Sequence, residues 1–293
     1  MSPFVHDLSV GEPAADAPVV VLVHGITANG LWWPRFAAEL ARRRPDVRIL
    51  APDLRGRAQS PADPDHGGLD VHVADLLAIA EAAPAPPLVV GHSMGAMVTA
   101  LFSAAHPSAL RGAVLVDGGL SFPLPPGLDV DATLATVLGP SLQRLTMSFP
   151  DEDAFVAFVA TNPAIAGLLA GEDREAMLTY LRHDMVHGQD GLVRSSCSDA
   201  AIRADGRDLM AHPRLPGAVA AAVAAGVPME FLWARRGLFD EPQGLYDEGR
   251  LAALALPEAL RVTHVPDTNH FDILLHAEGI AATCDAVERL LAV

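Results

Sequence analysis

The sequence predicts an α/β fold in which a mostly parallel sheet is flanked by helices and interrupted by a helical insertion. Over residues 1–120, short apolar runs alternate with segments of helical periodicity. Such alternation is typical of right-handed strand–helix–strand crossovers and of a parallel sheet. Residues 121–214 contain helical stretches without a convincing strand, and the alternation resumes after them. We therefore expect one α/β core formed by residues 1–120 and 215–293, with residues 121–214 as a helical cap.

The first half of the chain contains four predicted strands. Residues 19–23 are a continuous apolar run, as expected for a parallel strand that is covered on both faces. The elements that follow are a helix at 33–43, a strand at 47–51, a helix at 70–82, a strand at 87–90, a helix at 96–102 and a strand at 113–116.

The second half contributes the cap helices and the last two strands. Helical stretches cover residues 129–138, 151–160 and 174–182 of the cap. Apolar runs at 229–233 and 260–265 predict strands, and residues 276–291 predict a closing helix.

Composition and charge narrow the choice of partner and compartment. A chain of 293 residues that is 51% hydrophobic can bury a substantial core, and its formal net charge of −16 argues against nucleic acid and anionic membrane surfaces. Cys197 and Cys284 lie far apart without partner ligands at metal spacing, which argues against a disulfide framework or a zinc site. The start of the chain lacks the features of a signal peptide, and no apolar run suffices for a membrane span. We therefore expect a cytoplasmic protein.

A serine between two glycines is the most informative local pattern. Ser93 lies between Gly91 and Gly95, directly after the predicted strand at 87–90 and before the predicted helix at 96–102. On such a sharp strand-to-helix turn the serine backbone is strained and its hydroxyl is exposed, and larger residues at the glycine positions would collide with the neighbouring elements. Any Gly/Ser-rich turn can produce the pattern, but this setting favours a nucleophile.

The end of the first long strand supplies a second part of the site. His24 and Gly25 let the loop bend so that a backbone N–H faces the serine. Together with the N–H of Met94, an N–H at Gly25 or Ile26 would hold the oxyanion that forms in acyl transfer. An ordinary turn is the alternative, and the neighbouring elbow favours the oxyanion hole.

A serine hydroxyl needs a base within hydrogen-bond reach. Among the 12 histidines, only His270 lies in the loop after the last predicted strand, whose carboxyl end faces the same rim as Ser93. His92 lies inside the elbow, where we expect its side chain to pack or hydrogen-bond locally. His270 is therefore the predicted base.

Two aspartates compete as the acid that orients the imidazole. Asp117 ends the strand after the elbow helix and has little freedom, although it can also cap the turn that follows. Asp240 lies in the loop after the next strand, beside Glu241, and can equally be an exposed surface acid. Positional rigidity favours Asp117, but the residues alone leave the two alternatives close to even.

These motifs together resemble the α/β-hydrolase superfamily along essentially the whole chain. The His24 loop, the stretch at 51–56, the Ser93 elbow and His270 occur in the family order. The resemblance implies an α/β-hydrolase fold with an inserted helical cap. Most members place the acid after the strand that corresponds to residues 229–233, in a Gly-x-x-Asp turn, and residues 237–240 have that form. The resemblance therefore favours Asp240 over Asp117.

A minority of the superfamily carries the acid after the earlier strand, where Asp117 lies. It includes some haloalkane dehalogenases and the zearalenone lactone hydrolases. Dehalogenases and epoxide hydrolases use an aspartate nucleophile, so Ser93 argues against both. The lactone hydrolases use serine and are similar in having a helical cap. This narrower resemblance implies the opening of a macrocyclic or aryl lactone, and an acid at Asp240 would weaken it.

The predicted activity is that of a serine hydrolase that cleaves a carboxylic ester or lactone through an acyl-enzyme, without a metal or organic cofactor. Trp32 and Trp33 follow the oxyanion loop and are predicted to contact a small hydrophobic substrate, although Trp33 can instead pack the first helix. A thioesterase or acyltransferase, and a small-molecule receptor with slow turnover, share the same triad and are the alternatives. The sequence leaves the natural substrate and the formation of a homo-oligomer open.

Overall fold

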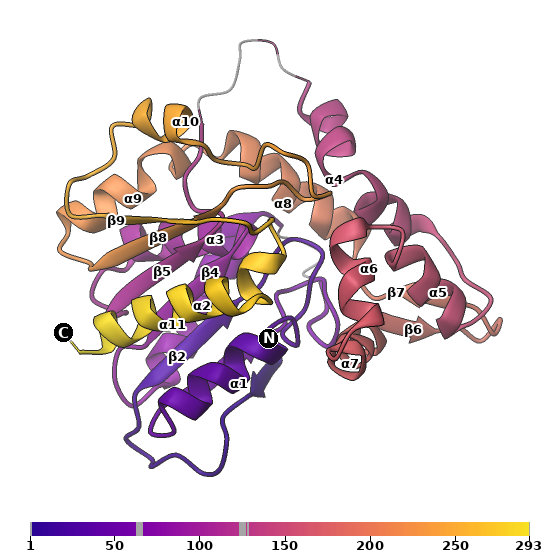
Figure 1. Ribbon diagram of the computed structural model, residues 1–293, viewed down its shortest axis with the longest axis horizontal. Coiled ribbons are helices and arrows are strands. Elements are labelled where there is room, and N and C mark those ends of the chain that lie inside the picture. The colour runs from indigo at the N-terminus through magenta and orange to yellow at the C-terminus, as the bar shows by residue number, and fades with distance from the viewer. Residues whose placement is uncertain (1, 63–66, 123–126, 128, 293) are drawn as a thin grey trace.

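A seven-stranded sheet forms the centre of the computed structural model, which describes residues 2–62, 67–122, 127 and 129–292 (Figure 1). The strands are β1 (Val5–Asp7), β2 (Val19–Val23), β3 (Arg48–Pro52), β4 (Leu88–His92), β5 (Gly112–Val116), β8 (Met229–Ala234) and β9 (Arg261–Val265). Their order across the sheet is β1-β3-β2-β4-β5-β8-β9. All neighbours are parallel except β1, which pairs with β3 in the antiparallel sense.

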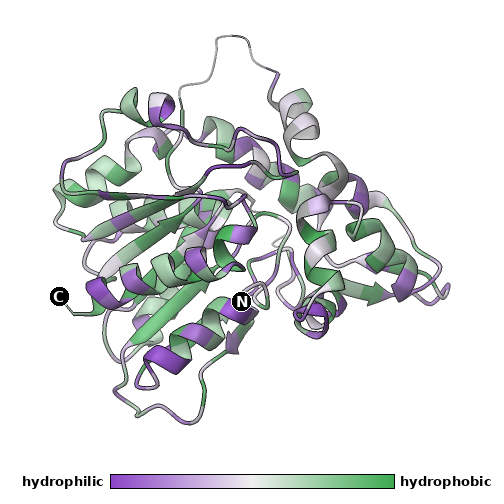
Figure 2. Ribbon diagram, in the orientation of Figure 1, coloured by the Kyte–Doolittle hydropathy of each residue, from purple (hydrophilic) through white to green (hydrophobic). Residues whose placement is uncertain are grey.

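Both faces of the sheet are covered, which explains why β2 is apolar throughout. Val19, Val21 and Val23 belong to one hydrophobic core, whereas Val20 and Leu22 belong to a second core on the opposite face. The helices that cover the first face are α2 (Leu69–Ala82), α3 (Met94–Ala105) and α9 (Leu215–Ala224), and those over the second are α1 (Pro34–Arg43) and α11 (Ala277–Leu291). The central strands are accordingly hydrophobic along their length (Figure 2).

The predicted fold class is confirmed, and the six predicted strands correspond to β2, β3, β4, β5, β8 and β9. The expectation that residues 121–214 lack strands is wrong. Within that range β6 (Met185–His187) and β7 (Val193–Ser195) form a small antiparallel pair. Each has three residues, so no alternating pattern is long enough to stand out in the sequence.

The elements between β5 and α8 lie together beside one end of the sheet (Figure 1). They are the hairpin β6–β7 and the helices α4 (Val130–Thr146), α5 (Glu152–Val159), α6 (Pro163–Ala170) and α7 (Arg174–Asp184). α4 is kinked at Gly139, whose φ of 33° interrupts the helix. The helix α8 (Asp199–Ala211) packs against both α4 and α2, so it joins this cap to the core.

Hydrogen bonds also tie the cap to the loop that follows β2. The Arg144 guanidinium in α4 forms an ion pair with Asp184 and donates to the carbonyl oxygen of Thr27 over 3.0 Å. The Asn29 amide donates to the carbonyl oxygen of Tyr180 in α7 over 3.1 Å. Two cap helices are thereby held against the loop that carries the predicted oxyanion hole.

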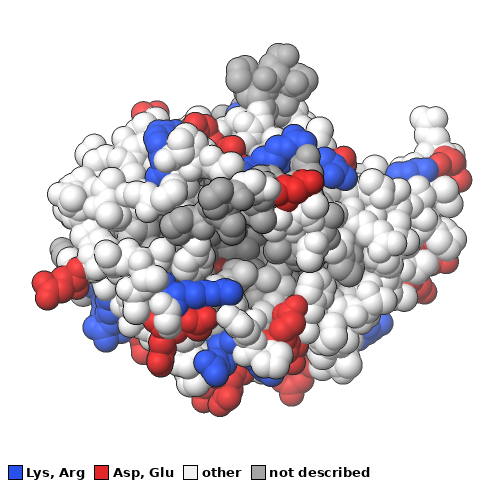
Figure 3. Space-filling model, turned by 90° about the horizontal axis from the view of Figure 1, so that it is seen from above, with Lys and Arg blue, Asp and Glu red and all other residues white. Residues whose placement is uncertain are grey.

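The rest of the described chain adds α10 (Glu248–Ala252) and the 3₁₀ helix η1 (Asp272–Leu274). Among the described residues, no helix combines the length and the hydrophobicity that a membrane crossing needs. Cys197 and Cys284 are both free and buried. On the face shown in Figure 3, acidic and basic side chains lie next to one another.

Candidate active site

Ser93 lies on the predicted sharp turn between β4 and α3. Its backbone has φ 56° and ψ −122°, a conformation that residues with a side chain rarely adopt. The turn is tight because a Cβ at Gly91 would lie 2.3 Å from the carbonyl oxygen of Gly95, and one at Gly95 would lie 1.9 Å from that of Val23. The Ser93 N–H donates to the carbonyl oxygen of Val116 in β5 over 3.0 Å. The serine is thus held firmly where it lines a pocket.

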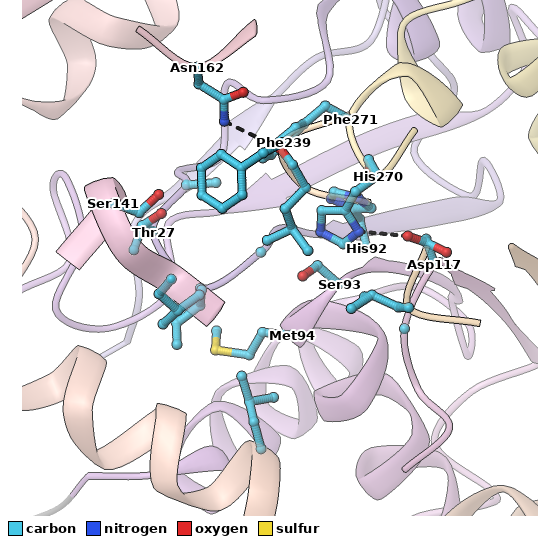
Figure 4. A pocket seen from close by; sticks show the side chains of 18 of the residues that line it. Thr27, His92, Ser93, Met94, Asp117, Ser141, Asn162, Phe239, His270 and Phe271 are labelled. Atoms are coloured by element: carbon cyan, nitrogen blue, oxygen red, sulfur yellow. Dashed lines mark hydrogen bonds and ion pairs between the residues drawn. The ribbon is translucent and has the colours of Figure 1, made fainter. Parts of the chain in front are cut away.

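His270 contacts Asp117 directly. Its Nδ1 lies 2.6 Å from Asp117 Oδ2, and both side chains are buried. The other carboxylate oxygen of Asp117 accepts a hydrogen bond from the Ala234 N–H over 3.0 Å, and the Asp117 N–H donates to Leu232 over 2.8 Å. The carboxylate therefore faces Nδ1 in a fixed orientation and favours the tautomer whose Nε2 is free to act as a base. Figure 4 shows Ser93, His270 and Asp117 in succession along the pocket.

Asp240 does not contact His270, so the expectation that it orients the imidazole is corrected. Asp240 Oδ1 accepts a hydrogen bond from the Asn269 amide over 3.0 Å and lies 3.1 Å from a nitrogen of Arg236. Its side chain is 38% exposed, whereas that of Asp117 is fully buried. The same loop turns Leu238 and Phe239 into the pocket. The Gly-x-x-Asp turn therefore directs apolar side chains inward and its carboxylate outward.

His24 holds the predicted oxyanion loop in place. Its Nε2 accepts the N–H of Leu54 over 2.9 Å, so its proton is on Nδ1, which donates to the carbonyl oxygen of Gly25 over 2.7 Å. Burial lowers the pKa of His24 to about 3, and the ring stays neutral in this tautomer at physiological pH. The neutral, fully hydrogen-bonded histidine acts as a support for the loop.

The predicted oxyanion-hole residues Gly25, Ile26 and Met94 all line the pocket beside Ser93. A Cβ at Gly25 would lie 3.3 Å from that of Ser93, so the loop backbone lies close to the serine. Met94 is the first residue of α3, where backbone N–H groups have no acceptor within the helix. The arrangement leaves these N–H groups suited to an oxyanion.

Arg57 is a supporting residue that the sequence reasoning missed. Its buried guanidinium donates two hydrogen bonds, of 2.9 and 2.7 Å, to the carbonyl oxygen of Ile26. It also lies 2.6 Å from a carboxylate oxygen of Asp205 in α8, which balances its charge. Arg57 directly follows the stretch at 51–56 that carries the family resemblance. The acceptor is a backbone carbonyl 31 residues earlier in the chain, so no spacing in the sequence points to it.

His92 supports the loop that carries His270. Its Nε2 donates to the carbonyl oxygen of His270 over 2.8 Å, and the two rings lie 4.7 Å apart. Burial, with the adjacent His270, holds the pKa of His92 well below its usual value. This ring therefore stays neutral, and its contacts are those of a positioning group.

The site opens into a cavity of about 390 Å³. Its walls come from the core and from the cap and are mainly apolar, and they include Trp32, Met97, Leu120, Leu138, Phe158, Ile165, Tyr180, Leu238 and Phe239. Trp32 lines the cavity, as the sequence predicts. Trp33 does not; it is fully buried and packs against Phe36 with ring centroids 6.0 Å apart, which corrects that expectation.

A few polar side chains interrupt the apolar wall. Thr27 and Ser141 lie side by side at one end of the view in Figure 4, and Asn162 lies above Phe239. None of these three was predicted as a site residue, because nothing in the sequence sets a cap serine or asparagine apart from surface ones. An apolar cavity with a few polar groups is the usual composition of a small-molecule site.

Sequence comparison agrees with the fold. The profile of the family described as the alpha/beta hydrolase fold matches residues 18–277. The chain belongs to this family. The fold and the family resemblance predicted from the sequence are thereby confirmed, and the coarse activity that the family supports is that of a hydrolase.

Individual α/β-hydrolases resemble this chain either over part of its length or at low sequence identity. Lipase LipV of Mycobacterium tuberculosis is 38% identical over 114 residues, which cover 38% of this chain and 41% of the lipase. The chain thus spans less than half the length of the curated relatives it matches. Among solved structures, E-2-(acetamidomethylene)succinate hydrolase has a TM-score of 0.72 at 22% identity, with 99% of this chain and 94% of that one covered. The thioesterase domain from the curacin biosynthetic pathway has a TM-score of 0.71 at 21% identity, with 100% of both chains covered. At these identities the likeness to solved structures concerns the fold.

Proposed function

We propose that this α/β-hydrolase is a serine hydrolase that cleaves a carboxylic ester or lactone of a bulky apolar compound. The observation that carries the proposal is the 2.6 Å contact between His270 Nδ1 and Asp117 Oδ2 in the pocket that also holds Ser93. An imidazole held at Nδ1 by a carboxylate offers Nε2 as a base, which is what a serine hydroxyl needs to become a nucleophile.

Acylation uses four groups of the site. His270 Nε2 takes the proton of Ser93 Oγ as that oxygen attacks the carbonyl carbon, and Asp117 stabilises the imidazolium. The carbonyl oxygen becomes an oxyanion that accepts hydrogen bonds from the backbone N–H groups at Met94 and in the Gly25–Ile26 loop. The C–O bond then breaks, and His270 gives its proton to the leaving alkoxide.

Deacylation reverses these roles with water. His270 Nε2 takes a proton from a water molecule as its oxygen attacks the acyl carbon of the Ser93 ester. The second oxyanion uses the same N–H groups, and its collapse returns the proton to Ser93 Oγ and releases a carboxylic acid. No step requires a metal or an organic cofactor.

Two features favour a lactone within the ester class. The acid that contacts His270 follows β5, which is where the zearalenone lactone hydrolases place theirs, and residues from core and cap line one apolar cavity. In a lactone the acyl and alcohol parts stay joined after cleavage, so a single cavity must hold both. A macrocyclic or aryl lactone of the zearalenone type is therefore our preferred substrate class.

The test is a substrate panel on the purified protein. It contains p-nitrophenyl esters of increasing acyl length, acyl thioesters, and an aromatic macrocyclic lactone such as zearalenone, whose opening adds one water to its mass. Ser93→Ala should reduce kcat by at least about 10⁴-fold on any substrate that turns over. Ser108→Ala makes the same change at an exposed serine that does not line the cavity and should retain turnover.

The remaining outcomes separate the alternatives. Faster turnover of thioesters, or acyl transfer to an added alcohol, would replace ester hydrolysis by a thioesterase or acyltransferase activity of the same serine. Thermal stabilisation by a lactone without turnover would support a receptor. Activity that survives Ser93→Ala would overturn the serine mechanism itself.

A further inference from the structure

Outside the active site, three metal-ligating side chains from distant parts of the chain converge on one point. His6 lies in β1, Asp53 follows β3, and His183 lies in the cap helix α7. His183 Nε2 is 2.8 Å from Asp53 Oδ2, His6 Nε2 is 3.3 Å from Asp53 Oδ1, and the two Nε2 atoms are 3.1 Å apart. None of the three lines the cavity that contains Ser93, so the cluster is separate from the catalytic groups.

These separations match a small coordination shell. Zinc binds imidazole nitrogen and carboxylate oxygen at about 2.0–2.2 Å, and tetrahedral geometry then spaces the ligand atoms about 3.3 Å apart. The two imidazole nitrogens lie 3.1 Å apart, and each lies 2.8–3.3 Å from one of the two carboxylate oxygens of Asp53, close to that spacing. Only a small adjustment of the rings would place both nitrogens and a carboxylate oxygen at bonding distance from one centre.

The carboxylate is prepared for a cation. Asp53 accepts hydrogen bonds from the N–H groups of Gly30 (2.8 Å) and Gln59 (3.2 Å), which orient both of its oxygens. Such hydrogen bonds behind a ligand are typical of protein metal sites.

Solvent can reach the cluster from one side. The side chains of His6 and His183 are 14% and 12% exposed, whereas Asp53 is fully buried. An ion can therefore enter, and a water molecule can complete a fourth position. Two imidazoles and one carboxylate are ligands that suit zinc and the neighbouring divalent transition metals better than magnesium or calcium.

We propose that His6, Asp53 and His183 bind a divalent transition metal ion of the zinc type, and that the ion fastens the cap to the edge of the sheet. The sequence gives no sign of the site, because its ligands are separated by 47 and 130 residues. The site also departs from the expectation that the chain binds no metal.

Through His183, a bound ion would affect the wall of the substrate cavity. Tyr180 and Leu181 of the same helix line that cavity, and the carbonyl oxygen of Tyr180 accepts a hydrogen bond from Asn29. An ion on His183 restrains the helix that carries this wall. We expect the metal to raise thermal stability and to change KM more than kcat, since no ligand of the ion touches the reacting groups.

The experiment measures metal binding directly. Full-length protein, freed of any affinity tag and treated with EDTA, is titrated with Zn²⁺ by calorimetry, and Co²⁺ is added as a visible-absorbing probe. The expected result is one ion per chain, cobalt absorption bands of a four-coordinate site, and a melting temperature that rises with Zn²⁺. His6→Gln and His183→Gln should each weaken binding by at least about tenfold and remove the bands.

The controls keep the test decisive. Glutamine can still donate to Asp53, so both variants should stay folded without metal, as checked by their melting temperature in EDTA. His187→Gln changes an exposed cap histidine that pairs with Glu152 and should bind Zn²⁺ like the parent chain. Absence of stoichiometric binding by the folded protein, or binding that survives in both variants at parental affinity, would overturn the proposal.

Discussion

The loops that follow β5 and β8 both carry an aspartate at the same edge of the sheet, yet only one of them serves His270. Asp117 directly follows β5, and its side chain is fully buried. Its carboxylate contacts the imidazole on one oxygen and the Ala234 N–H on the other. Asp240 lies six residues beyond the end of β8, with a 38% exposed side chain that pairs with Arg236.

The difference shows what an orienting acid requires. A buried carboxylate acts through a low dielectric and keeps one orientation, because each of its oxygens has a partner. An exposed carboxylate beside an arginine is screened by water and already neutralised. The number of residues between strand and acid decides which environment each aspartate enters.

The largest effect is expected for Asp117→Asn. The asparagine oxygen can keep the bond from the Ala234 N–H, but its amide nitrogen then faces His270 Nδ1 and forces the proton onto Nε2. In that tautomer the imidazole cannot take the Ser93 proton, and kcat should fall by about 10⁴-fold. Turnover of the best substrate from the panel measures the loss, and the melting temperature shows that the variant is folded. Activity above a tenth of the parental value would remove Asp117 from the mechanism.

The comparison also explains which parts of the site can be predicted from sequence. Ser93 and His270 can be found because their positions follow from local rules: a serine between glycines at a strand-to-helix turn, and a histidine in the loop after the last strand. The aspartate that orients His270 could not be identified in this way. Both aspartates follow parallel strands, and the choice depends on loop paths that a linear pattern does not contain.

Other residues escape prediction for related reasons. Arg57 acts on the backbone carbonyl of Ile26, and a carbonyl carries no signature in the sequence. Trp32 and Trp33 are adjacent and chemically identical, but the turn before α1 sends one ring into the cavity and the other into the core. The helices and the parallel strands were predictable because hydrophobic periodicity reports burial, whereas the facing of a single side chain depends on tertiary packing.

A smaller effect is expected for Arg57→Lys. This variant tests a buried residue that supports the oxyanion loop and takes no direct part in the reaction. Lysine keeps the charge beside Asp205 but cannot reproduce the paired hydrogen bonds from the guanidinium to Ile26. The oxyanion loop should loosen, and kcat should fall by on the order of 100-fold with a small change in KM. Steady-state kinetics on one soluble ester measures both constants.

Arg55→Lys is the matched control for that variant. Arg55 lies two positions earlier, and its guanidinium forms a paired contact with Asp75 in α2. The Arg55→Lys variant should lose some stability and keep the parental kcat. Equal losses of kcat in the two variants would mean that Arg57 supports the fold in general and not the oxyanion hole.

The smallest effect is expected for Asp240→Asn, and it sharpens the contrast with Asp117→Asn because the chemical change is the same. The asparagine oxygen can still accept from the Asn269 amide, whose own oxygen holds the N–H groups of Phe271 and Asp272. The change removes an ion pair with a partly exposed arginine, which is worth at most about 1 kcal/mol of stability. We expect kcat to stay within about twofold of the parental value, as for most surface substitutions. A loss comparable to that of Asp117→Asn would show that Asp240 moves to His270 during turnover, and the geometry of the loop after β8 would then have to change to bring the two groups together.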